Sequence, residues 1–306
     1  MSNKKLSTIS VGIPAYNEEK NIKNLLEKLL DQHLDGVKLA KIIVVSDCSI
    51  DNTIKEARKV KDFRIVIGEN TKRVGLNKVQ NKILRMAEED VLVLLDADVI
   101  PANNNFLNEL VKPILKDKRI GLVGADVSTL KAKTFFEKVI VQSHEFKMKM
   151  YTKINEKDNL YLCHGRGRAF SKPFYESLKF PSNVPEDSYS YLECKRRGFR
   201  FNFAPHAKVL FKSPKDFKDH MKQSFRFKDS PEKLKNYFPA NFVAENYSIP
   251  LRILIAQLFI ASLRKPILMS AYVFINMYTI WKKRDISIDH VVFDPSISTK
   301  NLELNI

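Results

Sequence analysis

The chain has 306 residues, of which 44% are hydrophobic and 28% are charged. This composition is typical of a globular protein and excludes a wholly disordered one. The formal net charge of +17 is high, and nucleic acid, anionic lipid or a phosphorylated substrate would each explain it.

Cys48, Cys163 and Cys194 are odd in number and far apart. They give no disulfide framework and no metal-ligand spacing, which favours a reducing, cytoplasmic compartment. The first residues contain no apolar signal core, so we expect no secretory peptide.

Short apolar strands alternate with amphipathic helices in the first ninety residues. Asn17 is a plausible N-cap for the first helix, because Glu18 and Glu19 would then lie in its first turn. Strand, helix, strand and helix in short steps predict a parallel, doubly wound sheet of the α/β class. Strands are predicted at residues 8–13, 41–46 and 64–67, and helices at 17–34, 51–60 and 76–89.

The most apolar strand covers residues 91–95, and Asp96-Ala97-Asp98 follows it directly. An unbroken apolar run of this kind is buried on both faces of a parallel sheet. Side chains two positions apart in an extended segment point the same way, so Asp96 and Asp98 can face one cation. Mg²⁺ and Mn²⁺ take carboxylates together with substrate phosphates. The motif alone is equally compatible with a turn that carries two solvated aspartates.

Later segments are mixed in character. A strand is predicted at residues 120–127 and a helix at 134–150. Residues 249–263 and 267–281 are largely apolar, but each is shorter than the roughly 20 residues that span a bilayer. A spanning hairpin, a pair lying in the membrane plane and a buried soluble pair all remain open. Trp281 beside the basic run 282–284 favours a membrane boundary.

Polar turns follow each predicted parallel strand. Such turns meet at one edge of the sheet, where open α/β folds bind nucleotides. One Asp-rich turn is usually only a turn, but four in chain order indicate a site. The turns cover residues 14–18, 47–53, 73–81 and 96–98.

These segments together resemble family 2 inverting glycosyltransferases of the GT-A type. The resemblance covers about residues 8–230. It includes Ile-Pro-Ala-Tyr-Asn-Glu at 13–18, residues 44–53, residues 75–81 and Leu-Leu-Asp-Ala-Asp at 94–98. Residues 165–170 are similar to the acceptor-side loop of the family, and Glu186-Asp187 resembles its acidic base motif. Residues 223–227 resemble the Gln-x-x-Arg-Trp motif of membrane-bound members, with Phe227 in place of tryptophan.

The resemblance implies a GT-A fold, with a Rossmann-like, mostly parallel sheet and a helical C-terminal extension. It also implies a nucleotide-diphosphosugar donor and Mn²⁺ or Mg²⁺ as cofactor, with Asp98 and Asp96 at the metal. The lysine that usually follows the motif glycine is here Leu76, so its phosphate role falls to Arg73 or Lys78 or is absent. Donor binding is implied for Pro14, Tyr16, Glu18, Asp47, Arg73, Lys78 and Asp96.

Asp187 is implied to be the general base that deprotonates an acceptor hydroxyl. A metal on one side of the sugar and one base on the other would give a single displacement with inversion. Glu186 and Asp187 could instead only complement a helix N-terminus. The arginines of the 165–170 loop could be solvated charges, residues 223 and 226 a plain surface face, and His164 and His206 structural. Contacts to acceptor or diphosphate are implied for Arg166, Gly167, Glu186, Gln223 and Arg226.

We therefore expect a glycosyltransferase domain at residues 1–235, with nucleotide-sugar binding at about 8–130 and the acceptor side at 131–235. Residues 236–306 are expected to form an apolar helical region that contacts the cytoplasmic face of the cell membrane. The expected reaction moves a single sugar, from a UDP-sugar in preference to a GDP-sugar, to a saccharide or lipid-linked acceptor. No multi-span channel follows the domain, which argues against a processive synthase. The alternative is a basic binding protein for anionic lipid or nucleic acid. The scattered basic residues argue against a nucleic-acid partner.

Overall fold

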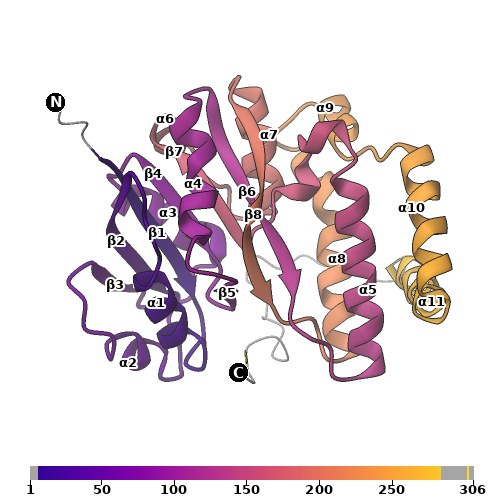
Figure 1. Cartoon of the computed structure of the whole chain (residues 1–306), viewed down its shortest axis with the longest axis horizontal. Helices are drawn as coiled ribbons and strands as arrows, with labels where there is room; N and C mark the ends of the chain where they lie inside the picture. Colours follow the sequence, from indigo (N-terminus) through magenta and orange to yellow (C-terminus); the bar gives the residue numbers. More distant parts are fainter. Residues whose placement is uncertain (1–5, 284–301, 303–306) are drawn as a thin grey trace.

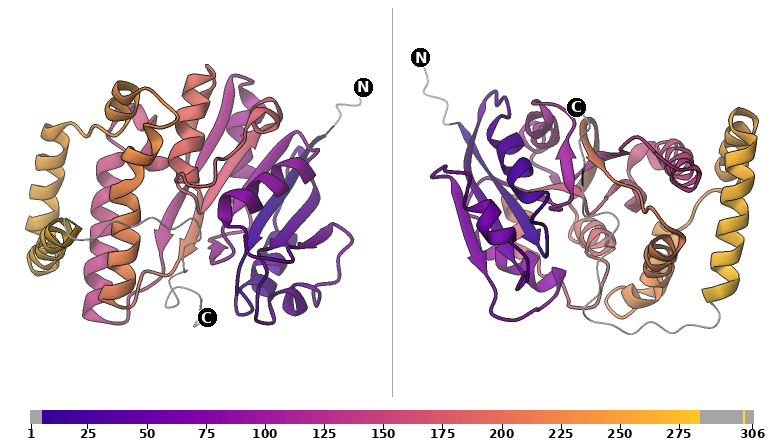
Figure 2. Two further views of the ribbon diagram at one scale, coloured as in Figure 1. Left: turned by 180° about the vertical axis from the view of Figure 1, so that it is seen from behind. Right: turned by 90° about the horizontal axis from the view of Figure 1, so that it is seen from below.

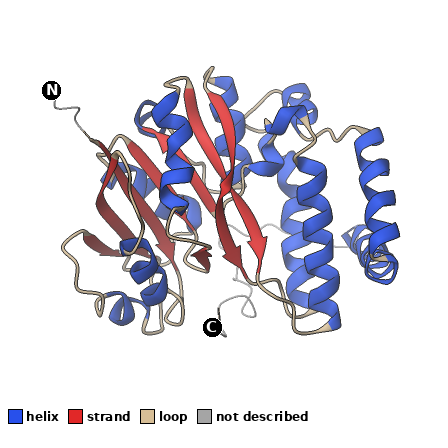
Figure 3. Cartoon of the chain, in the orientation of Figure 1, coloured by secondary structure: helices blue, strands red, loops and turns tan. Residues whose placement is uncertain are grey.

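A single eight-stranded sheet runs through the molecule in the computed structural model, which describes residues 6–283 and Leu302. Helices cover both faces of this sheet (Figures 1 and 3). The strand order is β3-β2-β1-β4-β7-β6-β8-β5. The strands are β1 Ser7–Ala15, β2 Val37–Ser46, β3 Ile65–Glu69, β4 Val91–Leu95, β5 Val99–Pro101, β6 Ile120–Thr129, β7 Gly167–Ser171 and β8 Arg200–Phe211.

The N-terminal half of the sheet is parallel, as the alternation of strands and helices predicts. β1 pairs with β2 and β4, and β2 pairs with β3, all in parallel. β6 and β8 are also parallel, whereas β7 is antiparallel to both of its neighbours and β5 is antiparallel to β8. The predicted α/β class with a mostly parallel sheet is therefore confirmed.

Two apolar cores lie on opposite faces of the sheet. Leu26 of α1 and Phe106 of α4 belong to one core, and Ile83 of α3 and Leu192 of α7 belong to the other. The helices are α1 Ile22–Leu30, α2 Thr53–Ala57, α3 Leu76–Met86, α4 Phe106–Lys116, α5 Phe135–Tyr151, α6 Lys172–Ser177, α7 Glu186–Arg196, α8 Phe217–Leu234, α9 Ala240–Asn246, α10 Leu251–Arg264 and α11 Pro266–Lys283. Two short 3₁₀ helices lie at Asn155–Lys157 and Leu160–Leu162.

The first helix begins later than its sequence pattern predicts. Asn17 has a left-handed backbone with φ of 55°, so the predicted N-cap role for Asn17 is wrong. Its side-chain oxygen instead accepts a hydrogen bond from the N–H of Ile50 at 2.9 Å. The helix starts after Asn21, and the carbonyl of Glu18 accepts from the N–H of Ile22 at 3.0 Å. Asn17 therefore ties two loops together rather than opening a helix.

The helix predicted at residues 134–150 is present as α5. Thr134 is its N-cap, and Glu137 completes a capping box in which each side chain accepts from the backbone N–H of the other. Such a box satisfies two of the N–H groups that a helix N-terminus leaves without partners. α5 thereby starts at a defined residue directly after the loop that follows β6.

The C-terminal helices α10 and α11 pack on α5 at the end of the molecule furthest from β3 (Figure 2). Phe146 and Met150 of α5 share a small apolar core with Met269 and Tyr272 of α11. Ala240–Arg264 is long and apolar enough to cross a membrane by length and composition alone, and 6% of its apolar window is buried. This segment contains α9, a turn and α10. Most of its apolar surface is therefore uncovered.

Part of the predicted C-terminal region, residues 284–301 and 303–306, lies outside the described residues. Leu302 is buried, and its N–H donates to the side-chain oxygen of Asn21 at 3.1 Å. The domain boundary predicted at residue 235 separates the sheet and α1–α8 from α9–α11, and it stays a prediction.

Candidate functional site

The carboxyl ends of β1, β2 and β4 meet at one edge of the sheet. These strands are neighbours and run in parallel, and they end at Ala15, Ser46 and Leu95. The N–H of Asp47 donates to the carbonyl of Ala15 at 2.8 Å, which joins the first residue after β2 to the end of β1. The predicted polar turns are therefore brought together.

Asp47 is buried and holds the loop that leads to α3. One carboxylate oxygen accepts from the N–H of Val74 at 2.9 Å, and the other accepts from the N–H of Gly75 at 2.8 Å. Asn70 adds a side-chain hydrogen bond at 3.1 Å. Gly75 has a φ of 91°, a conformation that costs glycine little and other residues much. Asp47 thus stabilises the loop before α3. Its contact with a nucleotide base stays a prediction.

Tyr16 and Arg73 stack on each other. The guanidinium carbon of Arg73 lies 3.9 Å from the centre of the Tyr16 ring, well within the range of a cation–π contact. Two residues predicted to bind the donor therefore form one surface, which is flat on the aromatic side and positively charged. Lys78, predicted for the same role, is exposed on α3. Pro14 lies in β1 opposite Val45.

Glu18 is buried between the first two loops. Its N–H donates to the Thr53 hydroxyl at 2.7 Å, and its carboxylate accepts from the Asn21 side chain at 2.8 Å. Glu19 accepts in turn from the N–H of Asn52 at 3.0 Å. These bonds fix the β1–α1 loop to the β2–α2 loop, so the edge that carries Tyr16 is built from two cross-linked turns.

Asp96 and Asp98 follow β4 and are both partly exposed, whereas Ala97 between them is buried. Burial, and after it the charge of Asp98, raises the pKa of Asp96 to about 6. Arg166 and Arg168 lower the pKa of Asp96, while Asp187 raises it. Asp98, Arg166, Arg168 and Asp187 therefore all lie within electrostatic range of Asp96. Two carboxylates that repel each other in this way form a favourable site for a divalent cation.

Asp187 and Glu186 lie in the first turn of α7. One oxygen of Asp187 accepts from the N–H of Ser188 at 2.6 Å. Burial raises the pKa of Glu186 to about 7, with Asp187 as the next cause and Arg168 opposing. Gly165 lets Glu186 approach the acceptor-side loop, because a Cβ at position 165 would stand 2.5 Å from Glu186 Oε1. The helix N-terminus and the acidic pair are thus both present, as the two sequence interpretations allow.

Arg168 is the largest fully buried side chain, so the interpretation of this residue as a solvated charge is wrong. Its Nη1 donates to the carbonyl of Glu186 and to the hydroxyl of Ser190, both at 2.9 Å. Its Nη2 lies 3.7 Å from Glu186 Oε1. A buried guanidinium needs such partners because an unpaired buried charge is costly. Arg168 therefore positions the first turn of α7, with Glu186 and Asp187 on it.

Helix α3 holds the segment that leads into α7. The Asn77 side chain donates to the carbonyl of Val184 at 2.9 Å. The Asn81 side chain donates to the carbonyl of Phe180 at 2.7 Å and accepts from the N–H of Phe180 at 2.8 Å. The motif at residues 75–81 thus connects the loop held by Asp47 to the segment before Asp187.

Arg166 stacks on Phe211, with its guanidinium carbon 3.9 Å from the ring centre. Gly167 begins β7 opposite Leu95. A Cβ at position 167 would lie 2.9 Å from the Cβ of Ala125, so close strand packing explains this glycine. Arg166 is thereby held over the end of β8, on the same side of the sheet edge as Asp96.

Gln223 and Arg226 both lie in α8, and the side chain of Arg226 is outside what the structure describes. Phe227 follows with 49% of its side chain exposed, and its ring centre is 6.2 Å from that of Tyr161. The role of Gln223 and Arg226 at the acceptor stays a prediction.

Sequence reasoning did not assign the positioning residues. Arg168, Asn77 and Asn81 act through backbone groups of distant segments, which no local pattern reveals. One signal was present for Arg168, because a charged residue in an apolar strand needs a buried partner. A weaker indication of a close contact was present at Gly165, because Gly165 and Gly167 flank Arg166.

Residues 10–178 match the model of the family "Glycosyl transferase family 2". Among curated proteins, the dolichol-phosphate mannosyltransferase of Pyrococcus furiosus is 34% identical over 30% of this chain and 26% of its own length. The poly(ribitol-phosphate) beta-N-acetylglucosaminyltransferase TarS of Staphylococcus aureus is 26% identical over 70% of this chain and 39% of its own length. The chain thus spans less than half of the length of either relative.

Solved structures share the fold. The mannosyltransferase PcManGT from Pyrobaculum calidifontis, in complex with GDP-Man and Mn²⁺, superposes with a TM-score of 0.61 at 20% identity. The superposition covers 90% of this chain and 87% of that one. S. aureus TarS 1–349 gives a TM-score of 0.55 at 18% identity over 81% of this chain and 72% of that one. The GT-A expectation is confirmed. The matched residues include most of β1, all of β2 to β4, Asp96 and Asp98, and the chain belongs to glycosyl transferase family 2.

Proposed function

We propose that the chain is a metal-dependent, inverting glycosyltransferase that moves one sugar from a nucleotide-diphosphosugar to an acceptor. The observation that carries this proposal is the convergence of Asp96, Asp98 and Asp187 with two arginines at the carboxyl edge of the sheet. A protein that only binds anions has no use for three acidic groups held together at such an edge.

Asp98 and Asp96 fit Mn²⁺ or Mg²⁺. Among residues 6–283 and Leu302, no group of three or more His, Cys, Asp or Glu side chains could hold a metal. A cation that also binds substrate phosphates usually takes only one or two carboxylate ligands from the protein. When bound, the cation supplies charge neutralisation for the departing diphosphate. The two aspartates would hold the cation at the end of β4, and Asp96 would also lie near the sugar of the donor.

Asp187 is the proposed general base. Its charge raises the pKa of Asp96, and it belongs to α7, so it would face the acceptor across the sheet edge. Arg168 holds the first turn of α7, which carries Asp187, through its hydrogen bond to the carbonyl of Glu186 at 2.9 Å. Glu186, Arg166 and Gly167 would contact the acceptor or the diphosphate, and Gln223 and Arg226 would do so from α8.

The nucleotide would lie against the Tyr16–Arg73 surface. The nucleotide base would stack on, or form hydrogen bonds with, the edge formed by Pro14, Glu18 and Asp47. The phosphates would contact Arg73 or Lys78. Neighbouring structures contain UDP-GlcNAc in TarS and GDP-Man in PcManGT. We propose a UDP-sugar ahead of a GDP-sugar as donor.

The acceptor is proposed to be a phosphate-bearing, lipid-linked molecule. Relatives are named for dolichol phosphate, for undecaprenyl phosphate and for poly(ribitol phosphate). The two apolar C-terminal helices suit a lipid acceptor at the cytoplasmic face of the membrane. Residues 251–283 contain no acidic side chain, which favours contact with anionic headgroups.

A thermal-shift panel tests the proposal. UDP-, GDP- and dTDP-sugars are added with and without Mn²⁺. A ligand at about 100 times its Kd stabilises the folded state by about 2.7 kcal/mol, so one nucleotide sugar should raise Tm in the presence of Mn²⁺. Asp98→Asn should lose the Mn²⁺-dependent part of the shift and all sugar transfer. Asp35→Asn, an exposed acid before β2, should keep both. If no nucleotide sugar raises Tm, the binding-protein alternative is favoured.

A further inference from the structure

A small cavity lies between α5 and α10, two helices that stand side by side in Figure 1. Its volume is about 20 Å³, which is room for about one or two small polar groups. We call it the helix cavity, and none of the residues that line it is acidic. The residues that matter here are Gln142, Phe146 and Lys149 from α5 and Gln257, Ile260 and Arg264 from α10.

Two glutamine side chains line the helix cavity from opposite helices. Gln142 is 8% exposed and Gln257 is 9% exposed. Neither amide has a hydrogen-bond partner in the part of the chain that the structure describes. Buried polar groups normally bond to protein, water or a ligand, because an unpaired one is unfavourable. Each amide carries N–H donors and an oxygen acceptor, so the pair is suited to the hydroxyl groups of a ligand.

Two cations lie at the rim of the helix cavity. Lys149 is in the last turn of α5, Arg264 ends α10, and both side chains are exposed. Neither makes an ion pair with another described residue. A phosphate between them would gain charge-assisted hydrogen bonds from both. The rim therefore favours an anion.

An exposed apolar surface begins at the same cavity. Ile260 lines the cavity and is 40% exposed, and Leu263 on the same helix is 69% exposed. From its buried part outward, the helix cavity thus offers amides, then cations, then apolar side chains. A phospholipid has the same order of groups, with a polar headgroup, a phosphate and acyl chains. This match in chemistry points to a lipid rather than to a free phosphate.

We propose that the helix cavity binds one anionic phospholipid whose headgroup carries free hydroxyls, as phosphatidylglycerol does. The headgroup hydroxyls bond to Gln142 and Gln257, the phosphate pairs with Lys149 and Arg264, and the acyl chains lie over Ile260. A phosphatidylcholine headgroup brings a quaternary ammonium to the two cations and has no hydroxyl for the amides. The inference rests on the proposed membrane contact and is independent of which sugar is transferred.

The test is a calorimetric titration of a short-chain lipid, dihexanoyl phosphatidylglycerol, into the full chain below the concentration at which the lipid forms micelles. A monomeric lipid is used so that binding does not depend on a membrane surface. We expect dihexanoyl phosphatidylglycerol to bind the native chain. Dihexanoyl phosphatidylcholine should bind at least about tenfold more weakly, because the attraction between an anionic ligand and the cations is lost.

Variants separate the two parts of the helix cavity. Gln142→Leu/Gln257→Leu keeps the size of the side chains and removes both amides, so it should bind phosphatidylglycerol about tenfold more weakly. Dihexanoyl phosphatidic acid has no headgroup hydroxyl, and this variant should bind it as the native chain does. Arg264→Ala should weaken the binding of both lipids, because it removes a contact to the phosphate.

Two controls separate the site from general charge and from the fold. Arg252→Ala removes an exposed cation from the same helix, at a position that does not line the helix cavity, and should bind both lipids as the native chain does. Arg264→Lys keeps the charge and should retain most of the affinity. Normal binding by Arg264→Lys would also show that α10 tolerates substitution at this residue.

The possible failures are distinct. If the native chain binds phosphatidylglycerol no better than phosphatidylcholine, the cavity holds only water and the inference is overturned. The inference is also overturned if the glutamine double variant binds phosphatidylglycerol normally. In both cases the membrane contact and the proposed sugar transfer stand. A native chain that binds monomeric phosphatidylglycerol but no anionic vesicle supports the lipid site and overturns the membrane contact. Nucleotide-sugar binding in the thermal-shift panel tests the proposed transfer separately.

Discussion

Asp187 is the residue on which the proposed chemistry depends most directly. Asp187→Asn keeps the size and most hydrogen bonds of the side chain but removes its ability to take a proton. We expect the rate of sugar transfer to fall by about 10²–10⁴, the usual contribution of a general base. Nucleotide binding measured by thermal shift should be retained, because Asp187 lies on α7 rather than on the loops around Tyr16.

Glu176→Gln is the matched control for Asp187→Asn. Its carboxylate lies on the short helix α6 and makes only a solvent-exposed pair with Lys172 at 3.8 Å, so activity should be unchanged. Loss of donor binding together with transfer in Asp187→Asn would reassign the residue to the donor site.

Residue types and spacing indicated the acidic residues as site candidates, but they did not indicate the residues that hold these acids in place. Asp96 and Asp98 follow an unmistakably buried strand, and Glu186-Asp187 follows a proline, so local sequence was informative. Arg168 contacts α7 from a strand 18 positions earlier in the chain. Such a contact depends on how β7 is inserted into the sheet, which the sequence pattern did not indicate.

Among the elements, α5 was predicted well, whereas β5 and β7 were not predicted. α5 begins at Phe135, directly after its N-cap Thr134, in agreement with the helix predicted at residues 134–150. β5 has three residues and β7 has five, and both depend on antiparallel partners far away in the chain. Their sequences carry too few residues to show a period of two.

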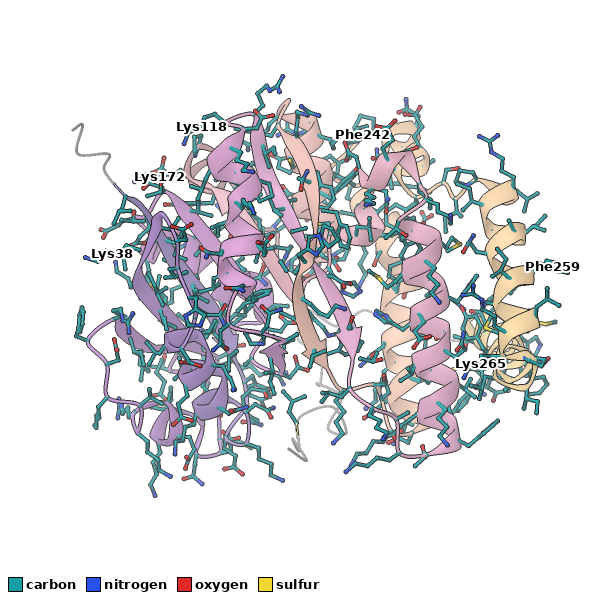
Figure 4. The ribbon with its side chains drawn as sticks, in the orientation of Figure 1. Lys38, Lys118, Lys172, Phe242, Phe259 and Lys265 are labelled. Atoms are coloured by element: carbon teal, nitrogen blue, oxygen red, sulfur yellow. The ribbon has the colours of Figure 1, made fainter. Side chains whose placement is uncertain are left out.

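Helices α10 and α11 expose apolar side chains that a water-soluble helix pair would bury. Phe259 on α10 is 64% exposed and is drawn at the outer edge of the molecule in Figure 4. Phe274 on α11 is 73% exposed. α10 has 14 residues, which extend over about 21 Å at 1.5 Å per residue. This is shorter than a bilayer core of about 30 Å, so we expect α10 to lie on the membrane.

The double variant Phe259→Glu/Phe274→Glu tests this expectation. Insertion of a phenylalanine stabilises binding by about 1.5–3 kcal/mol, so the variant should bind vesicles that contain anionic lipid at least about tenfold more weakly in a co-sedimentation assay. Phe63→Glu, at a position that is 93% exposed before β3, should leave binding unchanged. Equal binding by the native chain and the double variant would exclude this face as the membrane contact.

At the scale of the whole molecule, the acidic site should make stability depend on pH. The pKa of Glu186 is raised from 4.5 to about 7, chiefly by burial. Between these values the folded chain keeps a proton that the unfolded chain has released. The free energy of unfolding should therefore fall as the pH rises from about 4.5 to about 7. Asp96, with a pKa raised to about 6, acts in the same direction.

Glu186→Gln should reduce this pH dependence without abolishing it, since Asp96 remains. The measurement is urea unfolding at a series of pH values in the presence of a chelator, which keeps metal binding out of the comparison. Glu176→Gln serves again as the control and should follow the native curve. Identical slopes for the native chain and Glu186→Gln would show that Glu186 ionises normally in the folded state.

β7 has a consequence for how the molecule can move. It pairs with β4 on one side and β6 on the other, so hydrogen bonds run without interruption from the part of the sheet that contains β1 to β4 to the part that contains β6 and β8. A rigid seam of this kind leaves no hinge about which the two halves could rotate. If the proposed transfer takes place, we expect loops and side chains at the rim to admit and release substrates, while the backbone amides of β4, β7 and β6 exchange slowly with solvent.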